Sequence, residues 1–133
     1  MLESLSLEGK SVVITGGGTG LGRAMVRDMA RAGANLMIAG RPSGPIEEAA
    51  AEAESLGVKA VSEATDVTDS AQVAALMKAC MDRFGKIDVL LNNAGAVSDN
   101  VRKPIWELTD EEWDRVMRVN LTGAFYCARE VSQ

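Results

Sequence analysis

Short apolar runs alternate with longer segments of helical periodicity along the chain. Strands are predicted at the apolar runs SVVIT (11–15), NLMIAG (35–40), VKAVSEATDV (58–67) and KIDVLLNNAG (86–95). In the segment after each run, apolar residues recur at the spacing of one helix face. This alternation predicts right-handed crossovers, and hence an α/β fold whose parallel sheet carries helices on both faces.

The predicted helices end at glycines. The first follows the glycine-rich turn after residue 15 and ends at Gly33, and the second begins near Pro45 and ends at Gly57. A third helix is predicted over residues 69–84, just before Gly85. Glycine readily adopts the left-handed conformation in which helices commonly end, so these positions set the boundaries of the elements.

The last predicted helix begins with a capping box. The segment TDEEW has the Thr-x-x-Glu form, with Thr109 as the N-cap and Glu112 as the reciprocal partner. Apolar residues follow at helical spacing, and we expect the inner side of this helix to consist of Trp113, Val116, Met117, Leu121 and Phe125.

Composition limits the partners that the chain can have. The 133 residues suffice for one domain, and the net charge of −5 without any basic run argues against nucleic acid. No apolar run approaches the roughly 20 residues that a membrane span requires. The stretch MLESLSLEGK lacks the charged-then-apolar layout of an export signal, so we expect a cytoplasmic protein without a membrane partner.

Histidine is absent and cysteine is sparse. Without histidine, this chain alone holds no Ser-His-Asp or Cys-His hydrolytic site. Cys80 and Cys127 lie far apart in helical patterns, and this spacing fits neither a metal site nor a disulfide framework. We expect two reduced core thiols and no metal.

The stretch TGGGTGLG (15–22) lies between the first strand and the first helix. The first N–H groups of a helix have no internal partner and carry partial positive charge, so a glycine turn at this place predicts an anion site, with a pyrophosphate as the usual occupant. No Lys-Ser/Thr pair follows the last glycine, which excludes a P-loop. Taken alone, a glycine cluster could also be a flexible loop.

Four motifs in order carry a resemblance to a known family. The glycine stretch reads Thr-Gly-x-x-x-Gly-x-Gly, DV (66–67) closes the third strand, NNAG (92–95) follows the fourth, and VNLTGAF (119–125) places Asn120 in the last helix. Together they resemble the short-chain dehydrogenase/reductase family of the classical type. The resemblance covers essentially all 133 residues. It implies a Rossmann-type, doubly wound parallel sheet with strand order 3-2-1-4.

The resemblance also implies a set of cofactor-binding residues. The pyrophosphate would lie on the glycine turn, the adenine beside the third strand, and the ribose and the path to the nicotinamide beside the fourth. In that order, the residues are Gly16, Thr19, Gly20, Leu21 and Gly22, then Asp66 and Val67, then Asn93, Ala94 and Gly95.

Some of these residues have simpler interpretations. Asp66 could be a turn or helix-capping aspartate, and Asn93 could be ordinary turn chemistry. Asn92 is interpreted as structural, an amide that ties adjacent strands together.

The end of the second strand bears on the choice of cofactor. An acidic residue there would bind the ribose 2′-hydroxyl of NAD, whereas this chain has Gly40 followed by Arg41. Glycine leaves room for a 2′-phosphate and a guanidinium is well suited to bind it, so we predict NADP(H) rather than NAD. The alternative is that Arg41 is a solvated loop cation. Some NADP-dependent relatives have a second basic residue where this chain has Thr19, which argues against the preference for NADP.

The family's chemistry is hydride transfer between a nicotinamide and a small-molecule carbonyl or alcohol. In the family, a serine and a Tyr-x-x-x-Lys motif follow the helix that carries Asn120. Here the only tyrosine, Tyr126, is followed by Glu130 instead of lysine, so Asn120 is the only member of the catalytic set present. We therefore interpret residues 1–133 as a single NAD(P)-binding Rossmann domain without the C-terminal catalytic part, inactive by itself.

Two other functions are compatible with the sequence. The chain could be a non-catalytic nucleotide-binding module or an oligomerisation fragment. The fourth strand would form an apolar sheet edge, and the long helix would offer a further surface, so we expect a homo-oligomer.

Overall fold

The computed structural model describes residues 5–97 and 103–133, so the first four residues of the stretch examined for an export signal lie outside the described residues. Its sheet consists of β1 (Ser11–Thr15), β2 (Asn35–Gly40), β3 (Ala60–Ala64) and β4 (Val89–Leu91). All pairings are parallel and the order is β3-β2-β1-β4, which confirms the predicted topology.

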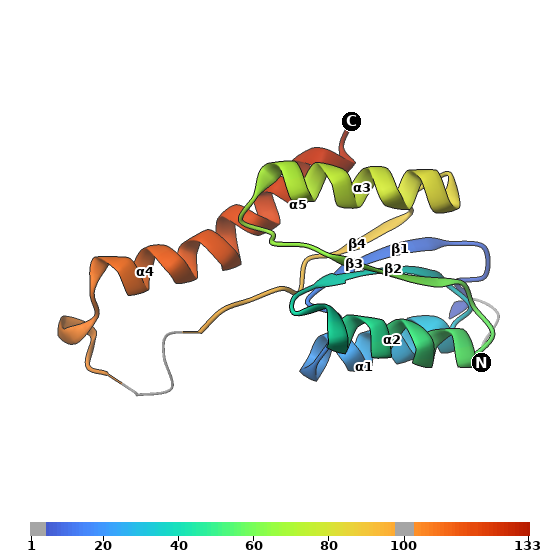
Figure 1. Ribbon diagram of the computed structural model, residues 1–133, viewed down its shortest axis with the longest axis horizontal. Coiled ribbons are helices and arrows are strands. Elements are labelled where there is room, and N and C mark those ends of the chain that lie inside the picture. The colour runs from blue at the N-terminus through green and yellow to red at the C-terminus, as the bar shows by residue number, and fades with distance from the viewer. Residues whose placement is uncertain (1–4, 98–102) are drawn as a thin grey trace.

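Helices cover both faces of the sheet (Figure 1). One face carries α1 (Gly20–Arg31) and α2 (Ser43–Ser55), and the other carries α3 (Ser70–Phe84) and α5 (Gly123–Val131). A short 3-10 helix, η2 (Ile105–Glu107), precedes α4 (Asp110–Met117), and the π-helical segment η3 (Arg118–Thr122) joins α4 to α5. No helix among the described residues has both the length and the apolar character needed to cross a bilayer.

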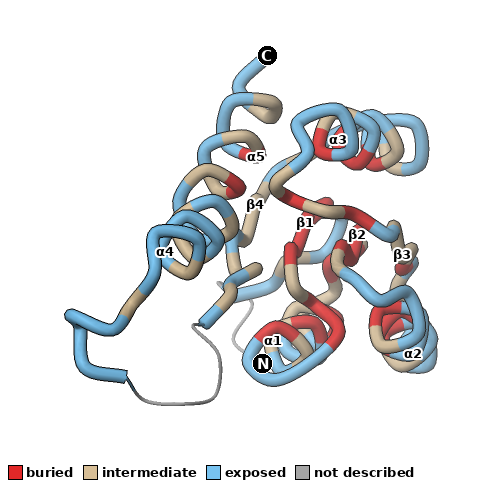
Figure 2. Tube along the Cα trace, turned by 60° about the vertical axis from the view of Figure 1, so that its left-hand side comes forward, coloured by how far each residue is buried: buried red, intermediate tan, exposed pale blue. Residues whose placement is uncertain are grey.

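The two central strands divide their side chains between two cores. Val12 and Ile14 of β1 face α1 and α2, whereas Val13 between them faces α3 and α5. Successive side chains of a strand point to opposite faces, so an unbroken apolar run serves two helical layers at once. Figure 2 shows the result as a buried centre at β1 and β2. Cys80 and Cys127, predicted to be core thiols, are both fully buried in the second core.

Some element boundaries differ from those predicted. The helix α2 begins at Ser43, before Pro45, because the N–H groups of a first helical turn need no internal partner and proline is therefore tolerated there. The strand β4 contains only Val89–Leu91, since β1 is its single partner among the described strands. The capping box of Thr109 and Glu112 is confirmed.

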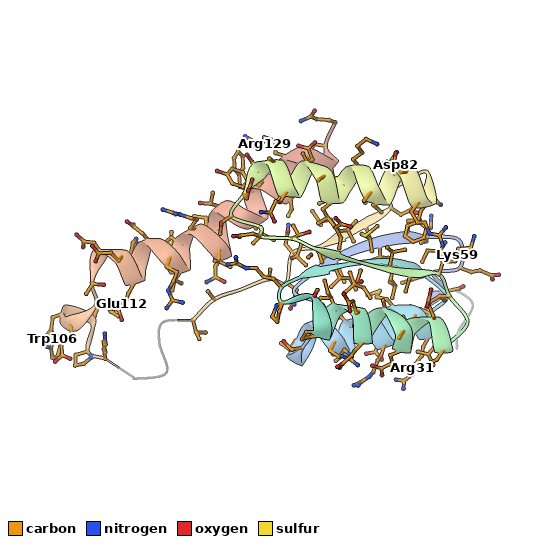
Figure 3. The ribbon with its side chains drawn as sticks, in the orientation of Figure 1. Arg31, Lys59, Asp82, Trp106, Glu112 and Arg129 are labelled. Carbon is orange, nitrogen blue, oxygen red and sulfur yellow. The ribbon has the colours of Figure 1, made fainter. Side chains whose placement is uncertain are left out.

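The predicted inner side of the last helix is wrong at three of its five positions. Trp113, Leu121 and Phe125 are 59%, 60% and 54% exposed, while Gly123 and Cys127 are buried. The helix α5 lies against α3, with Cys127 in the second core and Gly123 against Val67, whereas α4 extends away from the sheet (Figure 1). Figure 3 places Trp106 and Glu112 on this projecting arm. These three side chains thus face away from the core, while Val116 and Met117 of the same predicted stripe are half-buried.

Candidate functional site

A cavity of about 550 Å³ opens at the carboxyl ends of the strands. Every predicted cofactor residue except Gly20 lines it, and so does Asn120. Four further residues line the cavity without a role predicted from the sequence: Thr65, Ala96, Val97 and Val119. Ligands of open parallel sheets bind in a crevice at this end of the strands, so the topology and the cavity point to the same place.

The glycine turn presents the N-terminus of α1 to the cavity. The N-cap Thr19 makes no capping hydrogen bond with its side chain, and the first N–H groups of a helix have no partner within it. A Cβ atom at Gly22 would lie 2.0 Å from the carbonyl oxygen of Gly16, so only glycine allows the turn to close. These features leave backbone N–H donors available to an anion.

The β1–β4 side of the cavity is held by Thr15, a residue of the glycine motif for which the sequence predicted no role in the site. Its hydroxyl oxygen accepts the N–H of Asn93 at 3.1 Å and the N–H of Ala94 at 3.0 Å. The side-chain amide of Asn93 donates to the carbonyls of Thr15 and Gly16, both at 3.1 Å. The loop after β4 is thereby fixed against the glycine turn. A threonine that ends the strand before such a turn is the signal that could have predicted this role.

Two further asparagines make contacts near the site, Asn92 with α5 and Asn120 with the loop after β4. Asn92 was predicted to tie strands together, but its amide donates to the carbonyl of Ala124 in α5 at 3.5 Å. The tie between β4 and β1 is made instead by Asn93, because side chains of neighbouring residues point in opposite directions. Asn120 lies in the π-helical segment, and its amide accepts the N–H of Ala96 at 3.1 Å and donates to its carbonyl at 2.7 Å. A single side chain thus holds both polar groups of the Ala96 backbone.

The adenosine end predicted from the sequence contains an ion pair. Nη1 of Arg41 lies 2.9 Å from Oδ2 of Asp66, although the Arg41 side chain is 66% exposed. The other carboxylate oxygen of Asp66 accepts the hydroxyl of Thr68 at 2.7 Å and its N–H at 2.9 Å. The hydroxyl of Thr68 first, then its N–H and the charge of Arg41, hold the pKa of Asp66 below its ordinary value against the effect of burial. Asp66 therefore forms a local turn and also faces Arg41.

Comparison with known proteins agrees with this geometry. A family model described as short chain dehydrogenase matches residues 10–133. The chain belongs to the short-chain dehydrogenase family. One relative is the (5R,7aS)-5-hydroxy-7a-methyl-1-oxo-2,3,5,6,7,7a-hexahydro-1H-indene-carboxyl-CoA reductase of Mycobacterium tuberculosis, which is 42% identical over 125 residues, 92% of this chain and 47% of the relative.

Solved structures of the family share the fold. A short-chain type dehydrogenase/reductase from Mycobacterium marinum matches with a TM-score of 0.92 and 32% identity, over 98% of this chain and 52% of that one. A short-chain dehydrogenase/reductase from Burkholderia phymatum, solved in complex with NAD, matches with a TM-score of 0.89 and 33% identity, over 96% and 44%. The chain spans about half the length of the curated relatives it matches.

Replacement of Thr15 tests the support of the loop after β4. Thr15→Val leaves the N–H groups of Asn93 and Ala94 without their acceptor, and we expect the free energy of unfolding to fall by about 1–3 kcal/mol. Thr15→Ser keeps the hydroxyl and loses one methyl group, so its free energy of unfolding should fall by about 1 kcal/mol or less. Urea unfolding of both variants measures the difference, and equal losses would contradict the proposed support.

The pH dependence of stability tests the environment of Asp66. A carboxyl whose pKa is lower in the folded chain than in the unfolded chain stabilises the fold above its unfolded pKa, and this stabilisation disappears as pH falls through the folded value. We expect Asp66→Asn to be less stable than the parent chain above pH 3.8, with the difference closing at lower pH. Urea unfolding of both chains at a series of pH values measures this difference in stability. Asp28→Asn, at an exposed ion pair with Arg31, is the control and should change stability by less than about 1 kcal/mol.

Proposed function

We propose that this chain is the cofactor-binding part of an NADP(H)-dependent oxidoreductase that moves a hydride between the nicotinamide and a small-molecule carbonyl or alcohol. The observation that supports it most directly is one cavity that joins the uncapped N-terminus of α1 to a cation at the end of β2. When bound, the nicotinamide would supply or accept the hydride. The chain's own residues would bind and orient the cofactor.

The residues around the cavity fit a dinucleotide. The glycine turn, with Gly16, Thr19, Gly20, Leu21 and Gly22, would hold the pyrophosphate on N–H groups that have no partner in the helix. A side chain at Gly22 would disrupt this turn, since a Cβ atom there would lie 2.0 Å from the carbonyl oxygen of Gly16.

The remaining positions would serve the two nucleosides. Asp66 and Val67 would border the adenine, and Asn93, Ala94 and Gly95 would border the ribose and the nicotinamide. Since the amide nitrogen of Asn93 already donates to two carbonyls, we expect it to act on the ribose chiefly through the position of its backbone. Asn120 would support the catalytic end, because it holds Ala96 directly after this loop.

The choice of NADP over NAD rests on the end of β2. Gly40 offers no carboxylate to a ribose 2′-hydroxyl, and Arg41 lines the cavity directly after it. The guanidinium has five N–H donors, so the bond to Asp66 leaves others for a 2′-phosphate. The Burkholderia relative, solved with NAD, is the argument for NAD as the alternative.

A second candidate is a nucleotide-binding module without chemistry of its own. The chain has no Tyr-x-x-x-Lys motif, and its single tyrosine, Tyr126, packs on the second core and does not line the cavity. On either reading, we expect these 133 residues to bind the cofactor without turnover.

The environment and assembly of the protein are also proposals. We infer a cytoplasmic homo-oligomer. Its contact surface would use the exposed side chains of Trp113, Leu121 and Phe125, together with the side of β4 that has no partner among the described strands.

Cofactor discrimination tests the role of Arg41. Loss of a charge-assisted pair to phosphate typically costs about 1.5–3 kcal/mol, so Arg41→Ala should weaken NADPH binding about tenfold or more and NADH binding by less than about threefold. Isothermal titration calorimetry measures both constants. Arg31→Ala removes an exposed arginine paired with Asp28 and should leave both unchanged. Unchanged affinity for both cofactors would favour the solvated cation, and an equal loss for both would contradict a contact with the 2′-phosphate.

A turnover assay distinguishes binding from catalysis. The chain mixed with NADPH and a panel of ketones and aldehydes should show cofactor binding but no steady fall of absorbance, because the general acid of the family is not among its residues. Steady oxidation of NADPH that scales with protein concentration would contradict this expectation.

A further inference from the structure

Arg23 of α1 contacts two other segments of the chain. Its Nε lies 2.8 Å from Oε2 of Glu52 in α2, and its Nη1 donates to the carbonyls of Gly18 and Pro45, both at 3.3 Å. The side chain is 20% exposed, although arginine is usually a surface residue. One guanidinium therefore joins the glycine turn to the first turn of α2.

The two segments that Arg23 joins are also in direct contact. A Cβ atom at Gly18 would lie 2.9 Å from Cβ of Pro45 and 3.2 Å from Cγ2 of Ile46. The turn can therefore rest on α2 only where a glycine occupies this position. Arg23 then stabilises this contact between the glycine turn and α2, because it donates hydrogen bonds to a carbonyl of each segment.

Neither Arg23 nor its partners Gly18, Pro45 and Glu52 line the cavity, but residues that precede or flank these partners do. The glycine turn contributes Gly16 and Thr19, and the connection that leads into α2 contributes Arg41. We propose that Arg23 is a positioning residue that sets the spacing between the pyrophosphate turn and Arg41, and so tunes affinity for a dinucleotide with a 2′-phosphate. This inference rests on the proposed function.

The geometry requires a guanidinium and not only a positive charge. Nη1 has two hydrogens, one for each carbonyl, while Nε keeps its hydrogen for Glu52. A lysine ammonium is a point donor on a flexible stem and lacks this planar fork. Arg23→Lys should therefore keep the positive charge but no longer fix the spacing between the glycine turn and Arg41.

Arg27 provides a matched control on the same helix. Its Nε also bonds Glu52, at the other carboxylate oxygen. The structure gives it no hydrogen bond to Gly18 or Pro45, and its side chain is 44% exposed. Arg27→Lys therefore perturbs the same ion-pair cluster without releasing the glycine turn.

The test compares two ligands on the full 133-residue chain by isothermal titration calorimetry. ADP carries the pyrophosphate without a 2′-phosphate, whereas NADPH carries both. Only the binding of NADPH therefore depends on the spacing between the glycine turn and Arg41. We expect Arg23→Lys to weaken NADPH binding about tenfold and ADP binding by less than about threefold, since small displacements of positioned groups have large effects. Arg27→Lys should change either constant by less than about twofold.

Three results would contradict the positioning role of Arg23. Unchanged NADPH affinity in Arg23→Lys, equal losses for the two ligands, or an equal loss in Arg27→Lys would overturn the positioning role. If Arg23→Lys does not fold, Glu52→Gln loosens the anchor of Arg23 and should shift the NADPH-to-ADP ratio in the same direction; an unchanged ratio would overturn the proposal. A parent chain that binds neither ligand would instead overturn the proposed function itself.

Discussion

The site depends on how closely two backbone segments approach each other between β1 and α1. The carbonyl of Gly16 lies where any side chain at residue 22 would have to be, so the turn closes only with glycine. Closure places the first turn of α1 at the end of the sheet, with its N–H groups toward the cavity. It also sets where Gly18 meets α2 and where Asn93 meets β1. A side chain at Gly22 would separate α1 from β1, and the anion site would be lost with the contact.

Different interactions hold the two sides of the cavity. Next to β4, neutral groups make the contacts, as the hydroxyl of Thr15 and the amides of Asn93 and Asn120 bond to backbone. Next to β2, the contacts involve charge, with Arg41 on Asp66 and Arg23 on Glu52. Neutral hydrogen bonds are insensitive to salt, whereas the ion pair of the exposed Arg41 side chain is screened by it. The side near β2 is therefore the more responsive of the two to ionic conditions.

The sequence predicted what local signals determine. The apolar runs located the strands, and the alternation with helices fixed a parallel sheet, because few topologies are compatible with it. Motif spacing predicted most of the residues that line the cavity. The stripe from Trp113 to Phe125 was assigned to the wrong environment, since a periodic pattern marks an apolar face without showing what covers it. Thr15 and Arg23 were missed as organising residues because their partners are remote in the chain or are backbone groups, which the residue types along the sequence do not identify.

The pairing of Arg41 with Asp66 has a consequence for selectivity among anions. A cation that already faces a carboxylate presents little net charge, so a small free anion such as inorganic phosphate gains little by approaching it. A phosphate carried on a nucleoside arrives with other contacts already made, and it can compete with the carboxylate at high local concentration. In the proposed function, this ion pair would therefore favour a phosphate that belongs to a bound nucleotide over free phosphate in the surrounding medium.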